Sequence, residues 1–188
     1  MALSGLFKRS KHKDQAHSLY LAVVEQARKP AFYRHCGVPD TLDRRFEMIL
    51  IHSVPLLRRL REEGEAGIAL GQVIFDVMIN DMDQSLREMG VGDLGVGRRV
   101  KSMAKAYFGR TAAYELGLAV ADDKDLMTAL ERNLFGTVSV DARCLVVMAG
   151  YMRDLAVRLD SQSEAELLAG AVDFGDAPKH DEGDHNDE

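Results

Sequence analysis

The sequence AGIALGQVIFDVMINDMDQSLREM, residues 66–89, decides the fold class. Its apolar residues recur every three or four positions, as they do along one side of an α-helix. They fall into two rows: Leu70, Val73, Ile74 and Val77 in one, and Phe75, Met78, Ile79, Met82, Leu86 and Met89 in the other. A helix that is apolar over so much of its circumference is buried between neighbouring helices or covered by a partner.

The rest of the chain has the same helical periodicity, and no segment alternates as a half-buried strand does. The hydrophobic fraction is 46% but the aromatic fraction is only 6%, which suits packed helices better than a β-sandwich. We therefore predict an all-α protein, a single-domain irregular bundle of about six to eight helices. Pro55 is expected to kink or split the helix that begins near Leu42. Gly109 is a second expected interruption, in the helix that follows Asp93.

The charge is distributed unevenly along the chain. The net charge is -6, but residues 1–172 contain 23 acidic and 23 basic residues, so the whole excess belongs to the last sixteen positions. We expect a basic N-terminal segment over residues 1–14, a helical domain over 15–172 and a disordered acidic tail over 173–188. The neutral body gives no reason to expect DNA as a partner.

Several features indicate a cytoplasmic protein. Cys36 and Cys144 are far apart and form no paired motif, as is usual in a reducing compartment. No apolar run reaches the length of a membrane span, and the N-terminus has no apolar stretch of the kind that directs export. The basic N-terminal segment, with Leu3, Leu6 and Phe7, leaves open a peripheral position on the inner face of the cytoplasmic membrane.

The segment from Asn80 to Lys101, NDMDQSLREMGVGDLGVGRRVK, resembles two ligand-binding motifs and satisfies neither. As a calcium loop from Asp81, it would place Leu86 where the loop needs glycine and Gly92 where it needs glutamate. The GVGDLG spacing of a dinucleotide site follows a helix here and not a strand. We expect a helix end, a glycine corner and a new helix start, ordered by Asp81, Asp83, Arg87, Glu88, Gly90, Gly92 and Asp93.

The helix after this corner is basic. It carries Arg98, Arg99, Lys101, Lys105 and Arg110 and no acid between Leu94 and Arg110. Such a surface suits lipid phosphate, RNA backbone or an acidic protein, with a solvated face and local salt bridges as the plain alternative. Asp81, close to an apolar row, needs a partner, for which we expect an arginine of a neighbouring helix.

Catalytic motifs are missing from the sequence. It contains no GxSxG, HExxH or phosphate-binding loop, so we predict a protein that is not an enzyme, with no catalytic residues, no metal site and no cofactor. His17 and His52 are the residues that a haem carrier would use, although histidines at the edge of the core are commoner.

Two long stretches carry a family resemblance. LYLAVVEQARKPAFYRHCGVPDTLDRRFEMILIH, residues 19–52, and FDVMINDMDQSLREMGVGDLGVGRRVKSMAKAYFGRTAAYE, residues 75–115, resemble the ubiquinol–cytochrome c chaperone family, and the likeness extends over residues 19–134. The chain is similar to a bacterial member. The resemblance implies an all-helical, non-catalytic assembly factor for ubiquinol–cytochrome c reductase, respiratory complex III, that holds newly made cytochrome b. It also implies a small partner protein and the ribosome as further contacts of mitochondrial members.

A chaperone of this kind needs an adaptable apolar surface, which methionine supplies, and charges that orient the client. We predict that the partner-binding residues are the second apolar row with the bases beside it: Phe75, Met78, Met82, Leu86, Met89, Arg98, Arg99, Lys101 and Lys105. The alternative is that the row is simply core. An open hollow lined by methionine beside Lys101 would favour client binding. A haem or small-molecule carrier and a ribosome- or RNA-binding module that uses the basic helix are the alternative functions.

Overall fold

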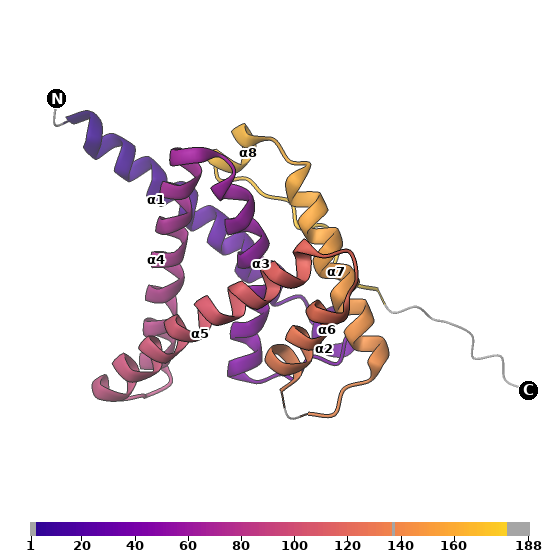
Figure 1. The fold of residues 1–188 in the computed structure, drawn as a ribbon. Helices are drawn as coiled ribbons and strands as arrows, with labels where there is room; N and C mark the ends of the chain where they lie inside the picture. Colours follow the sequence, from indigo (N-terminus) through magenta and orange to yellow (C-terminus); the bar gives the residue numbers. More distant parts are fainter. Residues whose placement is uncertain (1–2, 137, 180–188) are drawn as a thin grey trace, which may run out of the picture.

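The computed structural model describes residues 3–136 and 138–179. This part of the chain contains eight α-helices and one π-helical turn, and no strand (Figure 1). The elements are α1 (Leu3–Ala27), α2 (Pro30–Arg34), α3 (Leu42–Arg61), α4 (Gly64–Glu88), α5 (Asp93–Ala119), α6 (Lys124–Leu130), the π turn (Glu131–Phe135), α7 (Ala142–Asp160) and α8 (Glu164–Leu168). The prediction of an all-α bundle is confirmed.

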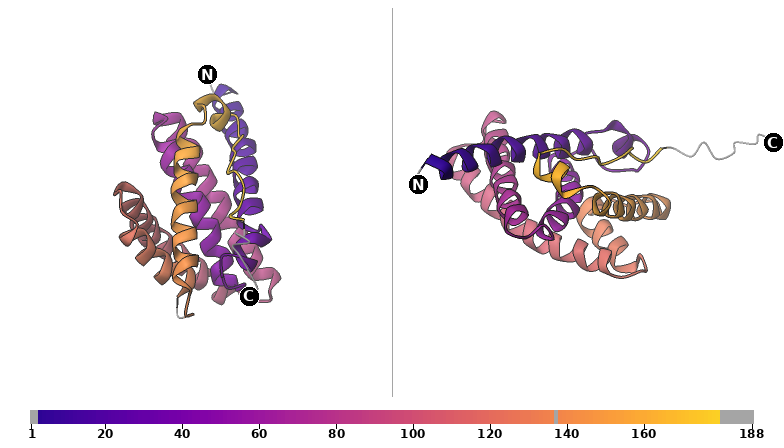
Figure 2. Two further views of the ribbon diagram at one scale, coloured as in Figure 1. Left: turned by 90° about the vertical axis from the view of Figure 1, so that its right-hand side faces the viewer. Right: turned by 90° about the horizontal axis from the view of Figure 1, so that it is seen from above.

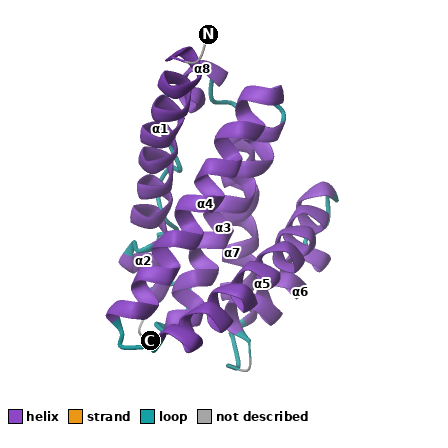
Figure 3. Cartoon of the chain, turned by 90° about the vertical axis from the view of Figure 1, so that its left-hand side faces the viewer, coloured by secondary structure: helices purple, strands orange, loops and turns teal. Residues whose placement is uncertain are grey.

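Helix α3 lies at the centre of the bundle. It packs against α1, α4, α5 and α7, and most of its residues from Phe46 to Leu60 are buried. Thr41 begins it, because the Thr41 hydroxyl accepts the Arg44 backbone N–H. The helix continues through Pro55, so the expected split does not occur. Figure 3 shows α1, α3, α4 and α7 running roughly side by side, with α5 tilted across them.

Helix α5 is one uninterrupted element of 27 residues, so Gly109 does not break it as expected. Its C-terminal part lies against α6 at Gly117, where an added Cβ would come within 2.7 Å of the Leu126 Cα atom. Gly117 is therefore required for the close approach of two helix backbones.

Replacing Gly117 by alanine is expected to lower the free energy of unfolding by about 1–3 kcal/mol, because the methyl group overpacks a backbone contact. Gly109 in the same helix is the matched control. A Cβ there meets nothing within 4 Å, so Gly109→Ala should raise stability by about 0.5–1 kcal/mol through helix propensity. Urea unfolding measures both, and equal effects at the two positions would contradict this account.

The segment after α8 differs from its expected disorder. Figure 2 shows this C-terminal strap, residues 171–179, running back between α1 and α7. Phe174 is buried, and its ring packs edge-on against His52 with centroids 5.6 Å apart. The Gly175 carbonyl accepts hydrogen bonds from Gln26 Nε2 (3.1 Å) and Lys29 Nζ (3.2 Å). The expected tail boundary at Asp173 is therefore wrong for residues 173–179; residues 180–188 lie outside the described part.

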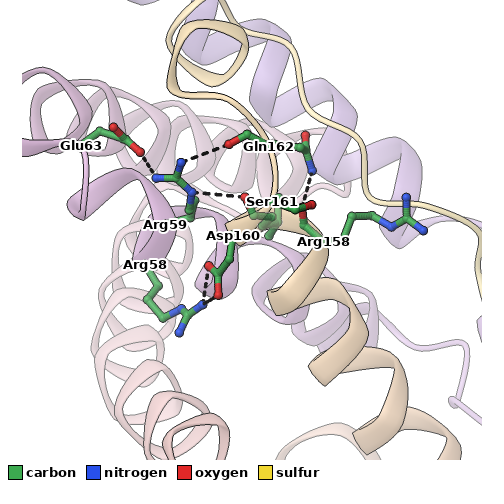
Figure 4. A network of polar contacts seen from close by, with 8 residues as sticks. Arg58, Arg59, Glu63, Arg158, Asp160, Ser161 and Gln162 are labelled. Carbon is green, nitrogen blue, oxygen red and sulfur yellow. Dashed lines mark hydrogen bonds and ion pairs between the residues drawn. The ribbon is translucent and has the colours of Figure 1, made fainter.

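A polar network fixes the end of α7 to α3 and to the strap (Figure 4). Arg59, although buried, donates to the Leu159 and Gln162 carbonyls at 3.2 and 3.1 Å and pairs with Glu63. The Gln162 side chain donates to the Asp173 carbonyl and accepts from the Asp173 N–H, both at 2.8 Å. These contacts explain why a segment with little apolar content still has a defined path.

The basic N-terminal segment is likewise not separate from the body. Helix α1 begins at Leu3 and continues without a break to Ala27, so its backbone joins residues 3–14 directly to the packed part of the helix. Among the described residues, no helix combines the length and the hydropathy that a transmembrane span requires.

Candidate functional site

The chain turns between α4 and α5 at a helix end, a glycine corner and a new helix start. Of the side chains expected to order this corner, Asp81 and Glu88 instead bond to Tyr20 and Gln84. Gly90 adopts a φ of +80°, and Gly92, with an ordinary extended backbone, caps the start of α5. Arg87 joins the two helices: its Nε atom lies 2.5 Å from Asp83 Oδ2, and a terminal nitrogen pairs with Asp93. The corner therefore fixes the direction in which α5 leaves α4. Its role in presenting a surface remains a prediction.

The apolar row predicted for partner binding is mostly core. Met78, Met82 and Leu86 are only 1%, 5% and 2% exposed. Phe75 is partly buried against the core, with its ring centroid 4.9 Å from that of Tyr107 on α5. Met89, by contrast, is 53% exposed. The row is therefore not one continuous surface, and the expectation that all five side chains are available to a partner is wrong.

An apolar hollow of about 310 Å³ nevertheless opens at the C-terminal end of α4. We call it the methionine hollow. Its apolar lining comes from α3, α4 and α5: Leu42, Phe46, Ile49, Met82, Leu86, Met89 and Met103. Its polar lining is Arg28, Arg45, Asp81, Ser85 and Glu88. The expected hollow lined by methionine is present, but Lys101 is not among its lining residues.

The bases of α5 separate into two groups. Arg98, Arg99, Lys101 and Lys105 are exposed, and none of them makes an ion pair with a residue that the structure describes. Arg110 instead turns inward, and its Nη1 atom lies 2.8 Å from Oε2 of the wholly buried Glu47. The predicted basic surface is therefore limited to the first half of the helix.

Asp81 has a different partner from the one expected. The Tyr20 hydroxyl of α1 donates to Asp81 Oδ2 at 2.7 Å, and no arginine pairs with this carboxylate among the described residues. Burial, together with this hydrogen bond, raises the pKa of Tyr20, so the phenol stays a donor. The Tyr20 hydroxyl is a neutral donor, so it positions the Asp81 carboxylate in the lining of the methionine hollow without adding a positive charge beside it.

His52 is fully buried and both its ring nitrogens are in use. Nδ1 lies 2.7 Å from the Met48 carbonyl, which can only accept, so Nδ1 carries the proton. Nε2 then accepts from the Tyr151 hydroxyl at 2.7 Å, and the Tyr151 oxygen accepts from Gln26 Nε2 at 2.9 Å. His52 can bind haem iron only by giving up one of these bonds. His17 is exposed on α1, and no metal-binding group of three or more side chains occurs in the described part of the chain.

Sequence reasoning missed the arginines of the hollow. Arg28 follows α1 and Arg45 lies in the first turn of α3, and both contribute to the methionine hollow. No periodicity links two residues on different elements. The only local signal is the basic pair Arg28 and Lys29 ahead of Pro30, which marks a helix end that stays accessible.

Comparison with known proteins identifies the family. The sequence model of the family described as ubiquinol-cytochrome C chaperone matches residues 34–174. This chain belongs to the ubiquinol–cytochrome c chaperone family. The match covers the methionine hollow except Arg28, and the basic half of α5 in full.

One solved structure has the same helical body, and curated relatives are similar in sequence. The crystal structure of the Cbp3 homolog from Brucella abortus gives a TM-score of 0.81 at 33% identity, over 94% of this chain and 97% of that one. Ubiquinol-cytochrome-c reductase complex assembly factor 1 of Xenopus laevis is 30% identical over 175 residues, 92% of this chain and 87% of the frog protein. The mouse protein of that name is also 30% identical, and the aligned region spans 57% of its length.

Proposed function

We propose that this protein is a non-catalytic assembly factor of ubiquinol–cytochrome c reductase that binds newly made cytochrome b at the inner face of the cytoplasmic membrane. Membership of the chaperone family and the names of its relatives support the respiratory complex. The observation that carries the client-binding part is the methionine hollow. A holder of an immature subunit needs an apolar site that adapts to irregular side chains, and the unbranched thioethers of Met82, Met89 and Met103 supply it.

The test in cells compares the complete respiratory chain with and without the protein. Deletion should lower the amount of ubiquinol–cytochrome c reductase and leave the other respiratory complexes unchanged. A tagged chain purified from membranes should retrieve cytochrome b, detected by mass spectrometry after crosslinking. Normal reductase levels in the deletion strain would overturn the proposal.

Met89→Asp tests the hollow itself. Met89 is exposed enough for the variant to fold, but the carboxylate would stand in the apolar opening and need a partner when the client covers it. We expect retrieval of cytochrome b to fall about tenfold. Leu94→Asp is the matched control, because Leu94 is 90% exposed, lies on the neighbouring helix and lines none of the hollow. Equal retrieval by the two variants would place the client elsewhere.

A further inference from the structure

A second hollow, of about 390 Å³, adjoins the methionine hollow and is cationic. We call it the arginine hollow; its lining residues are Arg28, Pro30, Tyr33, Arg34, Asp40 and Arg45. Three guanidinium groups face one carboxylate, which leaves an excess of two positive charges. The residues come from the end of α1, from α2 and from the start of α3, so the cluster exists only in the folded chain.

Only one of the three arginines is matched by an acid. Arg45 holds Asp40 with two hydrogen bonds, Nε to Oδ1 at 2.6 Å and Nη2 to Oδ2 at 3.0 Å. These bonds keep the pKa of Asp40 below its ordinary value, so the pair stays ionised. The exposed side chains of Arg28 and Arg34 make no hydrogen bond or ion pair with any described residue. Two guanidinium groups are thus available to an anion.

The two hollows lie next to each other, because Arg28 and Arg45 line both. Its charges are placed asymmetrically. The carboxylates of the methionine hollow, Asp81 and Glu88, lie on α4, whereas its arginines come from other elements: Arg28 follows α1 and Arg45 lies in the first turn of α3. An acidic group on a ligand is therefore repelled from the α4 side and attracted to the arginine side, which gives the site a direction.

We infer that this double hollow binds an acidic amphipathic peptide segment of the client: a large apolar side chain enters the methionine hollow, and an aspartate or glutamate about one helical turn away binds Arg28 and Arg34. The inference rests on the proposed function, since it describes how the client is recognised. Arginine suits a carboxylate because its planar fork can donate two parallel hydrogen bonds.

The depth of the apolar part favours a peptide over a membrane surface. The Met82 and Leu86 side chains are 5% and 2% exposed, so a group must enter the hollow to reach them. A bilayer instead takes up apolar side chains that project from a protein. The large apolar side chains that do project from α5 are Leu94, Phe108 and Leu116, at 90%, 64% and 60% exposure, and they line neither hollow.

Calorimetric titration of the full chain with short synthetic peptides that tile the extramembrane segments of the same organism's cytochrome b tests the inference. Binding peptides should carry an acid about one helical turn from a large apolar residue. Arg28→Ala/Arg34→Ala should weaken their binding about tenfold, as should replacing the peptide's acid by its amide. The two changes together should cost little more than either one, because they remove the same contact. Lys124→Ala/Arg143→Ala, which removes two exposed basic side chains outside both hollows, should leave binding unchanged.

Three results would overturn the inference: no peptide binds, binding ignores Arg28 and Arg34, or these arginines serve only binding to vesicles that contain phosphatidylglycerol. The proposed function fails separately. A chain that retrieves cytochrome b in cells but binds peptides independently of the two arginines keeps its function and loses this recognition site. A chain that binds acidic amphipathic peptides through them but retrieves no cytochrome b has this site and a different client.

Discussion

Replacing Arg110 by leucine is expected to lower the free energy of unfolding at neutral pH by about 3–5 kcal/mol, the cost of leaving a buried charge without its partner. The Glu47 side chain is wholly inaccessible, and Arg110 Nη1 lies 2.8 Å from its Oε2 atom. The Tyr114 hydroxyl donates to the other oxygen at 2.5 Å. Without the guanidinium group of Arg110, the Tyr114 hydroxyl and the weaker electrostatic effects of Arg44 and Arg132 would have to stabilise the buried carboxylate.

The pH dependence distinguishes a lost ion pair from lost packing. Burial already raises the pKa of Glu47, against the opposing effect of Arg110 and Tyr114. Removing Arg110 should raise this pKa further, so the variant takes up a proton on Glu47 as the pH falls. The deficit of Arg110→Leu should therefore shrink as the pH falls from neutral toward the ordinary glutamate pKa. Urea unfolding measured across that interval reports it, and a deficit that does not change would contradict the account.

A double variant provides the matched control. Glu47→Gln/Arg110→Leu removes both charges and keeps a side chain that can accept from Tyr114. Most of the lost stability should return, because Arg110→Leu destabilises the protein by leaving the Glu47 charge uncompensated and not by removing the ion pair as such. A double variant as unstable as Arg110→Leu alone would show that the arginine acts through its packing.

What the sequence predicts well is local. The ends of helices follow from single side chains near them: the Asp141 side chain accepts the Arg143 N–H at 2.8 Å, and the Ser163 hydroxyl accepts the Glu166 N–H at 3.3 Å and donates to the Glu166 carboxylate at 2.7 Å. Each of these contacts joins residues two or three positions apart. Periodicity likewise identifies α4, because its apolar spacing is a property of one helix.

What the sequence does not predict is how the helices meet. An apolar row indicates burial but not how deep each side chain lies. Met82 is 5% exposed, whereas Met89, which caps the C-terminal end of the same helix, is 53% exposed. Asp81 lies 61 positions from Tyr20, its partner, and no local rule chooses a tyrosine there over an arginine. Phe174 is one aromatic ring in a polar segment, and only the assembled cavity beside His52 explains its burial. The methionine hollow has the same origin, since three helices contribute to it.

His52 should make the protein sensitive to mild acid. Burial, with a smaller contribution from the positive charge of Lys29, lowers the pKa of His52 from 6.5 to about 4. Between those two pH values, the His52 imidazole binds a proton in the unfolded chain but not in the folded chain. The contribution of His52 to stability is therefore complete above the ordinary pKa of 6.5. It is lost as the pH falls through this window, by about 3 kcal/mol in total.

His52→Gln isolates this effect, because glutamine can still donate and accept but does not titrate. The wild type should lose stability more steeply than His52→Gln between pH 6.5 and about 4, the two limits of the histidine titration. Comparing the two chains cancels Glu47, whose raised pKa acts in the opposite direction, and the carboxylates Asp40 and Asp173, whose pKa values are lowered. Tyr151→Phe keeps the buried imidazole and should keep the steep slope. Parallel curves for the wild type and His52→Gln would mean that the folded protein accommodates the imidazolium, which would contradict this account.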